Sequence, residues 1–237
     1  GMSTEFASDK QPRSNVYTFD TPVPVPVVFE ETSDRSTLKL GFLSDPPRSF
    51  VFPQPSQIWG FDVAYENGPE GKTTVTVGFA PVVNKEKPFQ GLKIVLDPGH
   101  HPDPGALGPR GTEERAVTLL LARQLAEVLK AQGAQVILSR EDQPLELNQR
   151  PAKFRAAHPD LVISLHLNSV GDDEDPRQRW GTQNIYLYPH SQPLARSIHR
   201  YLTPMVRGHD LATVQRNLLV TRFSVCPTVL VESTPII

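Results

Sequence analysis

The sequence predicts an α/β fold, in which a twisted, mostly parallel sheet is flanked by helices and is preceded by a small all-β domain. Three observations lead to this prediction. From Gly91 onward, strand-like runs alternate with runs of helical periodicity, as they do in βαβ units. Residues 16–80 contain only short β-type runs, separated by Pro, Gly, Asn and Asp. Residues 81–90 carry Pro, Lys and Glu with few apolar residues, which is typical of a linker.

The N-terminal part is expected to consist of a flexible tail followed by the all-β domain. Residues 1–15 are polar and lack periodicity, which favours a tail. Strands are expected after it at residues 16–19, 25–29, 38–42, 58–65 and 73–79. Residues 67–72 predict a hairpin turn between the last two strands. The aromatic residues Phe50, Phe52 and Trp59 are expected to fill the core of this domain rather than to stack on sugars.

Residues 91–237 are expected to form the second domain. Strands are predicted there at residues 92–97, 135–138, 161–166, 184–188, 218–220 and 229–232. Helices are predicted at residues 113–131, 147–157 and 194–206. The first helix has apolar residues at helical spacing and stops at Gly133, whereas Pro151 is the weak point of the second. A sheet built from such units is covered by helices on both faces.

The composition excludes several classes of function. The chain of 237 residues has 24 Lys+Arg and 26 Asp+Glu, and this balance argues against binding to nucleic acid or to an anionic membrane through a broad basic field. Its apolar runs are far too short to span a bilayer. The single cysteine, Cys226, excludes an internal disulfide framework and a Cys-rich zinc site. The N-terminal residues do not have the pattern of a signal peptide.

Four polar residues stand where the reactive groups of such sheets gather, beyond the carboxyl ends of the strands. His100 follows the first predicted strand of the second domain, and His166 ends the apolar strand in its middle. Glu232 ends the last strand, and Glu114 opens the long helix. Two imidazoles and a carboxylate that converge can hold a catalytic zinc ion and leave its fourth position open to water. A further carboxylate, not bound to the metal, could then transfer the proton during amide hydrolysis.

Each of these residues also has a purely structural interpretation. A single His after a strand is usually structural or exposed, and Glu114 beside Glu113 could simply favour a helix N-terminus. Glu232 lies within an apolar run, where an unpaired carboxylate is costly to bury, and this favours a functional role. His101 adjoins His100 and could compete for the metal. The remaining histidines are expected to face solvent: His158, His190, His199 and His209.

Short motifs occur in a characteristic order between Leu92 and Glu232. They are residues 94–100 (IVLDPGH), 103–106 (DPGA), 139–142 (SRED), 163–169 (ISLHLNS), 217–220 (NLLV) and 227–232 (PTVLVE). In this order they resemble the zinc-dependent N-acetylmuramoyl-L-alanine amidases of bacterial cell-wall turnover. The resemblance implies an autolysin-type hydrolase of the bacterial envelope, in the periplasm or cell wall, with residues 91–237 as its catalytic domain.

The resemblance also implies the site and the substrate. The implied ligands of one Zn²⁺ per chain are His100, Glu114 and His166. Glu232 is implied as the catalytic carboxylate, and Asn168 and Arg140 are expected to orient the site, with His101 a further candidate for that role or for binding substrate. The implied partner is peptidoglycan, cut at the amide between N-acetylmuramic acid and L-alanine of the stem peptide. The N-terminal β domain is a candidate for attachment to the cell wall, and an appendage or an autoinhibitory cover are its alternatives.

The sequence departs from the family pattern at three places. His101-Pro102 stand where the family usually has Gly-Gly and one more residue, which shortens the loop beside a ligand. Ser169 stands where Ala is commoner. The chain stops soon after Glu232, where relatives continue through a further helix, so we expect a trimmed or short C-terminus. Two alternative functions therefore stay open: a peptidoglycan-binding or regulatory module that keeps the fold without catalysis, and a zinc carboxypeptidase-like peptidase.

Overall fold

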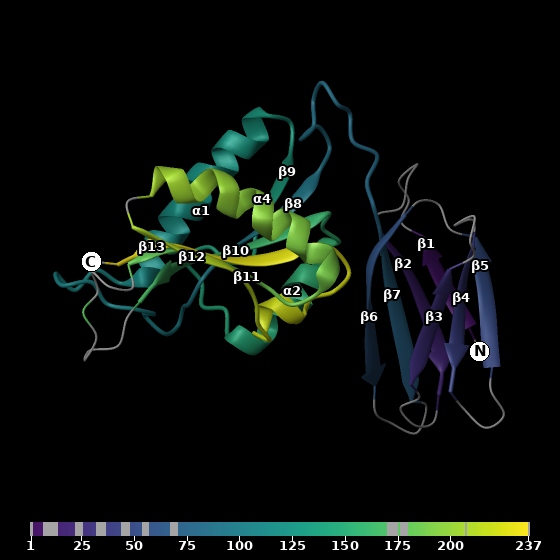
Figure 1. Ribbon diagram of the computed structural model, residues 1–237. Coiled ribbons are helices and arrows are strands. Elements are labelled where there is room, and N and C mark those ends of the chain that lie inside the picture. Colours follow the sequence, from purple (N-terminus) through teal and green to yellow (C-terminus); the bar gives the residue numbers. More distant parts are fainter. Residues whose placement is uncertain are drawn as a thin grey trace. The chain divides into compact units, whose positions relative to one another are not determined.

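Two units make up the chain, Gly1–Val82 and Val83–Ile237, and each has a hydrophobic core of its own (Figure 1). The boundary between them falls inside the segment 81–90 that the sequence predicts as a linker. The computed structural model describes residues 2–6, 14–21, 26–31, 37–43, 48–53, 57–66, 71–169, 175, 180–206 and 208–236.

The N-terminal unit is built from two antiparallel sheets. One has the strand order β1-β2-β7-β6 and the other the order β3-β4-β5. Their bounds are β1 (Met2–Phe6), β2 (Ser14–Asp20), β3 (Val27–Glu31), β4 (Thr37–Phe42), β5 (Arg48–Pro53), β6 (Ile58–Glu66) and β7 (Lys72–Phe79). In β7, Val75 and Val77 are fully buried and alternate with less buried threonines, as expected of a strand with one face in the core. Side chains from the two sheets meet in that core, where the rings of Phe19 and Phe42 lie 4.6 Å apart.

The small all-β domain predicted from the sequence is therefore confirmed, with two differences. The N-terminal tail is wrong for Met2–Phe6, because these residues pair with β2 as strand β1. Strand β5 was not predicted, but the expectation for Phe50 holds, because its ring packs 5.0 Å from Phe19 and 5.9 Å from Phe42. Residues 67–70 of the predicted turn and the side chain of Phe52 lie outside the described residues.

The C-terminal unit contains a six-stranded sheet with the order β12-β11-β13-β10-β8-β9. Its strands are β8 (Lys93–Pro98), β9 (Gln135–Leu138), β10 (Leu161–Asn168), β11 (Gly181–Tyr186), β12 (His209–Gln215) and β13 (Thr228–Pro235). Neighbouring strands run parallel except for β11 and β13. The prediction of a mostly parallel sheet is confirmed.

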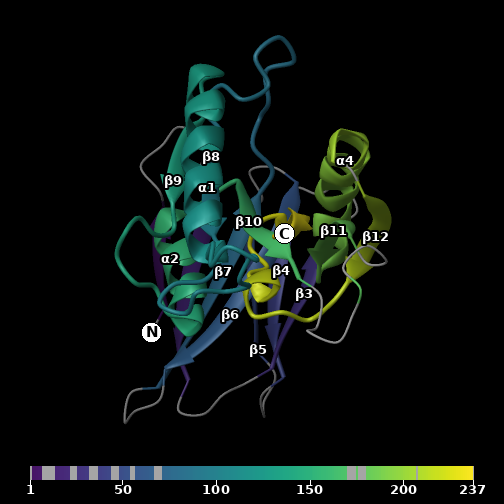
Figure 2. The same ribbon diagram turned by 90° about the vertical axis from the view of Figure 1, so that its left-hand side faces the viewer.

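Helices cover both faces of this sheet. Helices α1 (Glu114–Ala131) and α4 (Gln192–Leu202) lie over one face, and α2 (Arg150–Ala157) lies over the other (Figure 1). Figure 2 shows α1 beside β8 and β9, and α4 beside β11 and β12. On α1 the small residues Ala122 and Ala126 are buried against the sheet, which lets the helix approach the apolar side chains of β8 and β10 closely.

Most predicted elements of this unit are found within a few residues, and three differ. Residues 218–220 are not a strand; a 3₁₀ turn, η4 (Val220–Arg222), follows Leu219 instead. Strand β12 was not predicted, and its half-exposed residues lack a clear alternation. The second helix begins as a 3₁₀ turn, η1 (Leu147–Gln149), and becomes α-helical at Arg150, so that Pro151 stands in the first turn, where a missing N–H costs little. Among the described residues, no helix is both long and apolar enough to cross a membrane.

Candidate metal centre

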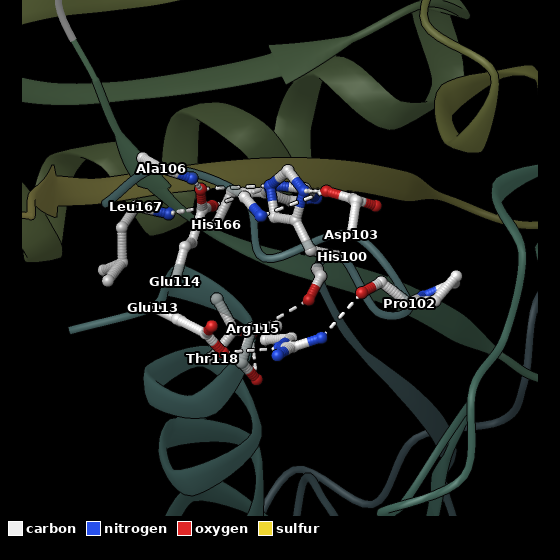
Figure 3. Close-up of polar contacts among 12 residues, drawn as sticks. His100, Pro102, Asp103, Ala106, Glu113, Glu114, Arg115, Thr118, His166 and Leu167 are labelled. Atoms are coloured by element: carbon white, nitrogen blue, oxygen red, sulfur yellow. Dashed lines mark hydrogen bonds and ion pairs between the residues drawn. The ribbon is translucent and has the colours of Figure 1, made fainter. Parts of the chain in front are cut away.

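Three side chains converge at the carboxyl ends of β8 and β10 (Figure 3). His100 comes two residues after β8, His166 lies in β10, and Glu114 is the first residue of α1. Nε2 of His100 lies 3.0 Å from Oε2 of Glu114, and Nδ1 of His166 lies 3.2 Å from Oε1 of the same carboxylate. The sheet topology thus brings together three residues that the sequence places far apart.

These donor atoms fit a zinc ion. Two nitrogen or oxygen ligands at about 2.0–2.1 Å from a tetrahedral zinc ion lie roughly 3.3 Å from each other. The two nitrogen–oxygen separations, each to a different oxygen of Glu114, are close to that value, and one ligand atom from each residue can be chosen so that all three lie within 4.8 Å of one another. Two imidazoles and one carboxylate form a donor set found in catalytic zinc sites.

Glu114 is held as a charged carboxylate. It is 3% exposed, and its two oxygens accept hydrogen bonds from the backbone N–H groups of Ala106 and Leu167, both at 2.9 Å. Burial by itself would raise the pKa of this carboxyl, but hydrogen bonds from His100, His166 and the two amides outweigh it and hold the pKa well below its usual range. Glu114 therefore does more than begin a helix, because one of its oxygens contacts His100 and the other contacts His166.

His100 is oriented by a second carboxylate. Its Nδ1 lies 2.6 Å from Oδ1 of Asp103, and the same oxygen accepts a hydrogen bond from the N–H of Gly105. Burial would lower the pKa of His100, but the hydrogen bonds and charges of Glu114 and Asp103 raise it above its ordinary value. A carboxylate on the far nitrogen of a ligand histidine fixes which nitrogen faces the metal. Asp103 belongs to the motif at residues 103–106, but it is not among the site residues predicted from the sequence. Its position three residues after His100 is the sequence signal that it could contact that histidine.

The candidate ligands pack directly against two glycines, where any larger residue would overlap with their side chains. A Cβ at Gly99 would lie 2.5 Å from the ring of His166. A Cβ at Gly105 would lie 2.6 Å from Cδ2 of His100 and 2.7 Å from Oε2 of Glu114, and Gly105 has a φ of +69°. Glycine is required at both positions by the packing of the ligands, and at Gly105 also by the backbone conformation.

Glu232 stands beside His166 on the neighbouring strand. The two are direct partners in the parallel pairing of β10 and β13, so their side chains project from the same face of the sheet. Oε2 of Glu232 is buried and has no hydrogen-bond partner within the described part of the chain. Burial, and to a smaller degree the charge of Glu114, raise the pKa of Glu232, although the nearby histidines oppose this. An unpaired carboxylate with a raised pKa next to the three candidate ligands is a candidate for proton transfer.

The four groups line one pocket of about 400 Å³. Its lining includes His100, Glu114, His166 and Glu232, with Asp103 beside His100. Arg150, Asn168 and Ser169 contribute further polar groups. Apolar side chains complete the lining: Leu147, Leu167, Leu218, Leu219, Val220 and Leu230. The pocket lining therefore combines a few polar groups with apolar side chains, as small-molecule sites commonly do.

The other predicted site residues differ in position. Asn168 lines the pocket, whereas Arg140 is buried beside it and donates hydrogen bonds to the carbonyls of Pro98 and Gly99. Burial and the neighbouring charge of Arg150 lower the pKa of Arg140 to about 10. His101 is not part of the three-residue group; its Nε2 lies 3.1 Å from the carbonyl oxygen of Asp142.

Two of the four histidines expected to face solvent do not. Nε2 of His190 is buried, and His199 has a side chain only 12% exposed, with Nε2 at 2.7 Å from Oδ1 of Asp210. These two residues flank and occupy α4, whose inner side packs on the sheet, and the sequence alone does not show which side of that helix is covered. His158 and His209 are exposed as expected.

Comparison with known proteins identifies relatives of the C-terminal unit. A family model described as N-acetylmuramoyl-L-alanine amidase matches residues 94–236. The uncharacterized protein YqiI of Bacillus subtilis is 30% identical over 155 residues, which are 65% of this chain and 74% of that protein. The N-acetylmuramoyl-L-alanine amidase LytC of Bacillus subtilis is 32% identical over 155 residues, but the match spans only 31% of its length and 64% of this chain.

Solved structures agree with this comparison. The amidase AmiC2 of Nostoc punctiforme has 30% sequence identity and a TM-score of 0.57, and the match covers 62% of this chain and 82% of that one. The catalytic domain of the amidase CwlV from Bacillus (Paenibacillus) polymyxa has 30% identity and a TM-score of 0.56, over 61% of this chain and 81% of that one.

Proposed function

This chain belongs to the N-acetylmuramoyl-L-alanine amidase family, and from that premise we propose that it is a zinc-dependent peptidoglycan hydrolase. It cleaves the amide between the lactyl group of N-acetylmuramic acid and L-alanine of the stem peptide. The observation that carries the proposal is the group of His100, Glu114 and His166 in one pocket with the unpaired Glu232.

In this proposal His100, Glu114 and His166 hold one zinc ion per chain. The chemistry that zinc supplies at such a site is polarisation of the scissile carbonyl and a lowered pKa of water. Glu114 contributes a negative charge that is already fixed by two backbone amides, and Asp103 presents the Nε2 atom of His100 toward the other ligands. The protein's own part is therefore to hold the ligands in place before the metal arrives.

Glu232 is the proposed general base and acid. A carboxylate oxygen of Glu232 accepts a proton from the water that attacks the amide carbon. As the C–N bond breaks, Glu232 returns the proton to the nitrogen of L-alanine, so that the products are a lactyl carboxylate and a free peptide amino terminus. The raised pKa of Glu232 suits both steps, because a carboxyl with an ordinary pKa is a weaker base and loses its proton too readily near neutral pH.

The location and the second unit follow from the substrate. Peptidoglycan lies in the cell envelope, so we place the protein in the periplasm or cell wall, and we assign attachment to the wall to the N-terminal β unit. Phe50 packs against the core through Phe19 and Phe42, and the side chain of Phe52 lies outside the described residues, so we take the partly buried Trp59 as the aromatic residue to test. A Trp59→Ala change in an inactive Glu232→Gln background is expected to reduce co-sedimentation with insoluble peptidoglycan; equal co-sedimentation would remove Trp59 from this role.

The activity is tested by comparing Glu232→Gln with the unmodified protein. The unmodified protein with zinc is expected to release stem peptides with free L-alanine amino termini from intact peptidoglycan, as identified by mass spectrometry. Glu232→Gln keeps the shape of the side chain, and the rate is expected to fall by about 10²–10⁴ while the zinc content stays the same. Glu127→Gln, which changes an exposed carboxylate on α1, is the matched control and should retain full activity.

The other outcomes point to the two alternative functions. Stoichiometric zinc without any peptide release would favour a binding or regulatory module. Release of single terminal amino acids alone would favour a carboxypeptidase-like peptidase.

A further inference from the structure

The turn that carries His100 is held by two arginines. Arg140 donates hydrogen bonds to the carbonyl of Pro98 at 3.1 Å and to that of Gly99 at 2.8 Å. Arg150 donates to the carbonyl of Pro98 at 2.8 Å and also to the carbonyl of His100. Three consecutive backbone carbonyls are therefore bound by guanidinium groups, and water does not need to satisfy them.

Arg150 is itself fixed from the other side. It is 2% exposed, and its Nη1 lies 2.6 Å from Oδ1 of Asp97, which is fully buried. The second oxygen of Asp97 accepts a hydrogen bond from Ser164 at 2.7 Å, and Ser139 donates to the first. With both carboxylate oxygens occupied, Asp97 has little freedom to move, and the guanidinium that it binds is held in one orientation.

The conformation of His100 depends on these contacts. His100 has a φ of +62°, in the left-handed region that costs a residue other than glycine about 1–2 kcal/mol. The directions of the two peptide planes on either side of a Cα set its φ and ψ, and thereby the direction of its Cβ. Here the carbonyl before that Cα, of Gly99, is bound by Arg140, and the carbonyl after it is bound by Arg150. The two bonds thus constrain the direction of the Cα–Cβ bond of His100, from which the contact with Asp103 sets the imidazole.

We propose that Arg150 is a positioning residue of the metal centre, which through Asp97 and the His100 carbonyl holds His100 in the left-handed conformation from which its imidazole reaches Glu114. The inference rests on the proposed function, since it assigns Arg150 a purpose at the zinc ligands named there. A competing interpretation is that Asp97 and Arg150 form a buried ion pair that stabilises the unit without any effect on the ligands.

The test is the zinc affinity of Arg150→Lys, measured by competition with a chromophoric chelator. Lysine keeps a positive charge beside Asp97, but its single nitrogen does not reproduce the bonds of a guanidinium to both Asp97 and the His100 carbonyl. The dissociation constant for zinc is expected to rise about 10- to 100-fold, the usual effect of removing a group that orients a ligand. The visible absorption of the cobalt(II) form is expected to change as well, because it depends on ligand geometry.

Phe154→Leu supplies the control for a loss of stability alone. Phe154 lies on the same helix, is fully buried with its ring 5.7 Å from that of Phe223, and has no polar side-chain atom that could bind the His100 carbonyl. This variant is expected to lower the melting temperature but to leave the zinc dissociation constant within about threefold. The proposal is overturned if folded Arg150→Lys binds zinc and cobalt as the unmodified protein does, or if Phe154→Leu weakens zinc binding as much.

A second variant keeps the proposal testable if Arg150→Lys does not fold. Asp97→Asn retains Arg150 and both serine partners but removes the charge that fixes the guanidinium, and its zinc affinity is expected to fall at least threefold. An unchanged affinity in folded Asp97→Asn would then refute the proposal. Failure of the proposed function looks different, because it is seen in the unmodified protein: that protein would bind no stoichiometric zinc, or would bind zinc and release no stem peptides, whatever residue 150 is.

Discussion

Gly105→Ala is expected to weaken zinc binding at least tenfold with only a moderate loss of stability. The added Cβ would lie 2.6 Å from Cδ2 of His100 and 2.7 Å from Oε2 of Glu114. Carbon atoms in favourable contact lie about 3.5–4.0 Å apart, so the imidazole of His100, or the loop that carries residue 105, must move by about 1 Å. His100 and Glu114 are both proposed zinc ligands, and a displacement of this size matters because metal sites tolerate only small departures from their ligand distances.

Gly111→Ala is the matched control in the same loop. Gly111 has a φ of +74°, close to the +69° of Gly105, but none of the described residues brings an atom within 4 Å of the added Cβ. Both variants bear the cost of a left-handed alanine, about 1–2 kcal/mol. In a unit of this size that cost lowers the melting temperature by roughly 2–8 °C. Only Gly105→Ala also moves the ligands.

The assay measures zinc dissociation constants and melting temperatures for both variants beside the unmodified protein. Gly111→Ala should keep the zinc affinity within about threefold, and Gly105→Ala should lose a factor of about 10 or more, which corresponds to at least ~1.4 kcal/mol of binding free energy. Equal zinc affinities for the two alanine variants would refute the reasoning, because the contacts with His100 and Glu114 would then have no effect on the metal centre.

His166→Ala is expected to reduce bound zinc from about one ion per chain to nearly none, since it removes one of three protein ligands; an unchanged zinc content by elemental analysis would contradict the ligand assignment. Cys226 is 2% exposed and burial raises the pKa of its thiol, so a thiol reagent should modify it at neutral pH only after unfolding in urea. Rapid modification of the folded protein would contradict the burial of this thiol. Burial lowers the pKa of His190, although a hydrogen bond with the backbone of Cys226 opposes this. The imidazole therefore binds a proton at higher pH in the unfolded chain than in the folded one, and the free energy of unfolding should decrease as the pH falls below 6.5. His190→Gln should make that decrease smaller in urea unfolding, and identical pH dependence in both proteins would refute it.

The sequence predicts the parts of the C-terminal unit whose signals are local. The strands at 92–97 and 161–166 are short apolar runs next to turn residues, and the helix at 113–131 has an apolar face at regular spacing. At the ends of these elements and of the strand at 229–232 stand the four polar residues that the structure brings into one pocket, so the candidate site follows from topology once the strands are placed.

The features that are not predicted from the sequence depend on interactions that leave no periodic pattern in it. The run at 218–220 is apolar enough for a strand, but Thr221 makes side-chain hydrogen bonds with Leu218 and with the carbonyl of Arg216, and these favour a turn. Strand β12 is an edge strand with a residue of positive φ, Ala212, and its pairing with β11 is irregular, so no alternation marks it in the sequence. The bond between Arg150 and Asp97 joins residues 53 apart, which no local pattern indicates.

The pairing of β10 and β13 also determines which insertions and deletions leave His166 and Glu232 beside each other. His166 and Glu232 lie on adjacent strands as register partners, so the separation of their backbones is set by the strand spacing of about 4.8 Å. Deleting one residue of β13 ahead of Glu232 would shift the register of the strand by one residue. The carboxylate of Glu232 would then project from the face covered by α1 and α4, and all the other shifted side chains would change face as well. Insertions in surface loops leave that separation unchanged. Within this family, natural variation in length is therefore expected between these two strands and not within them.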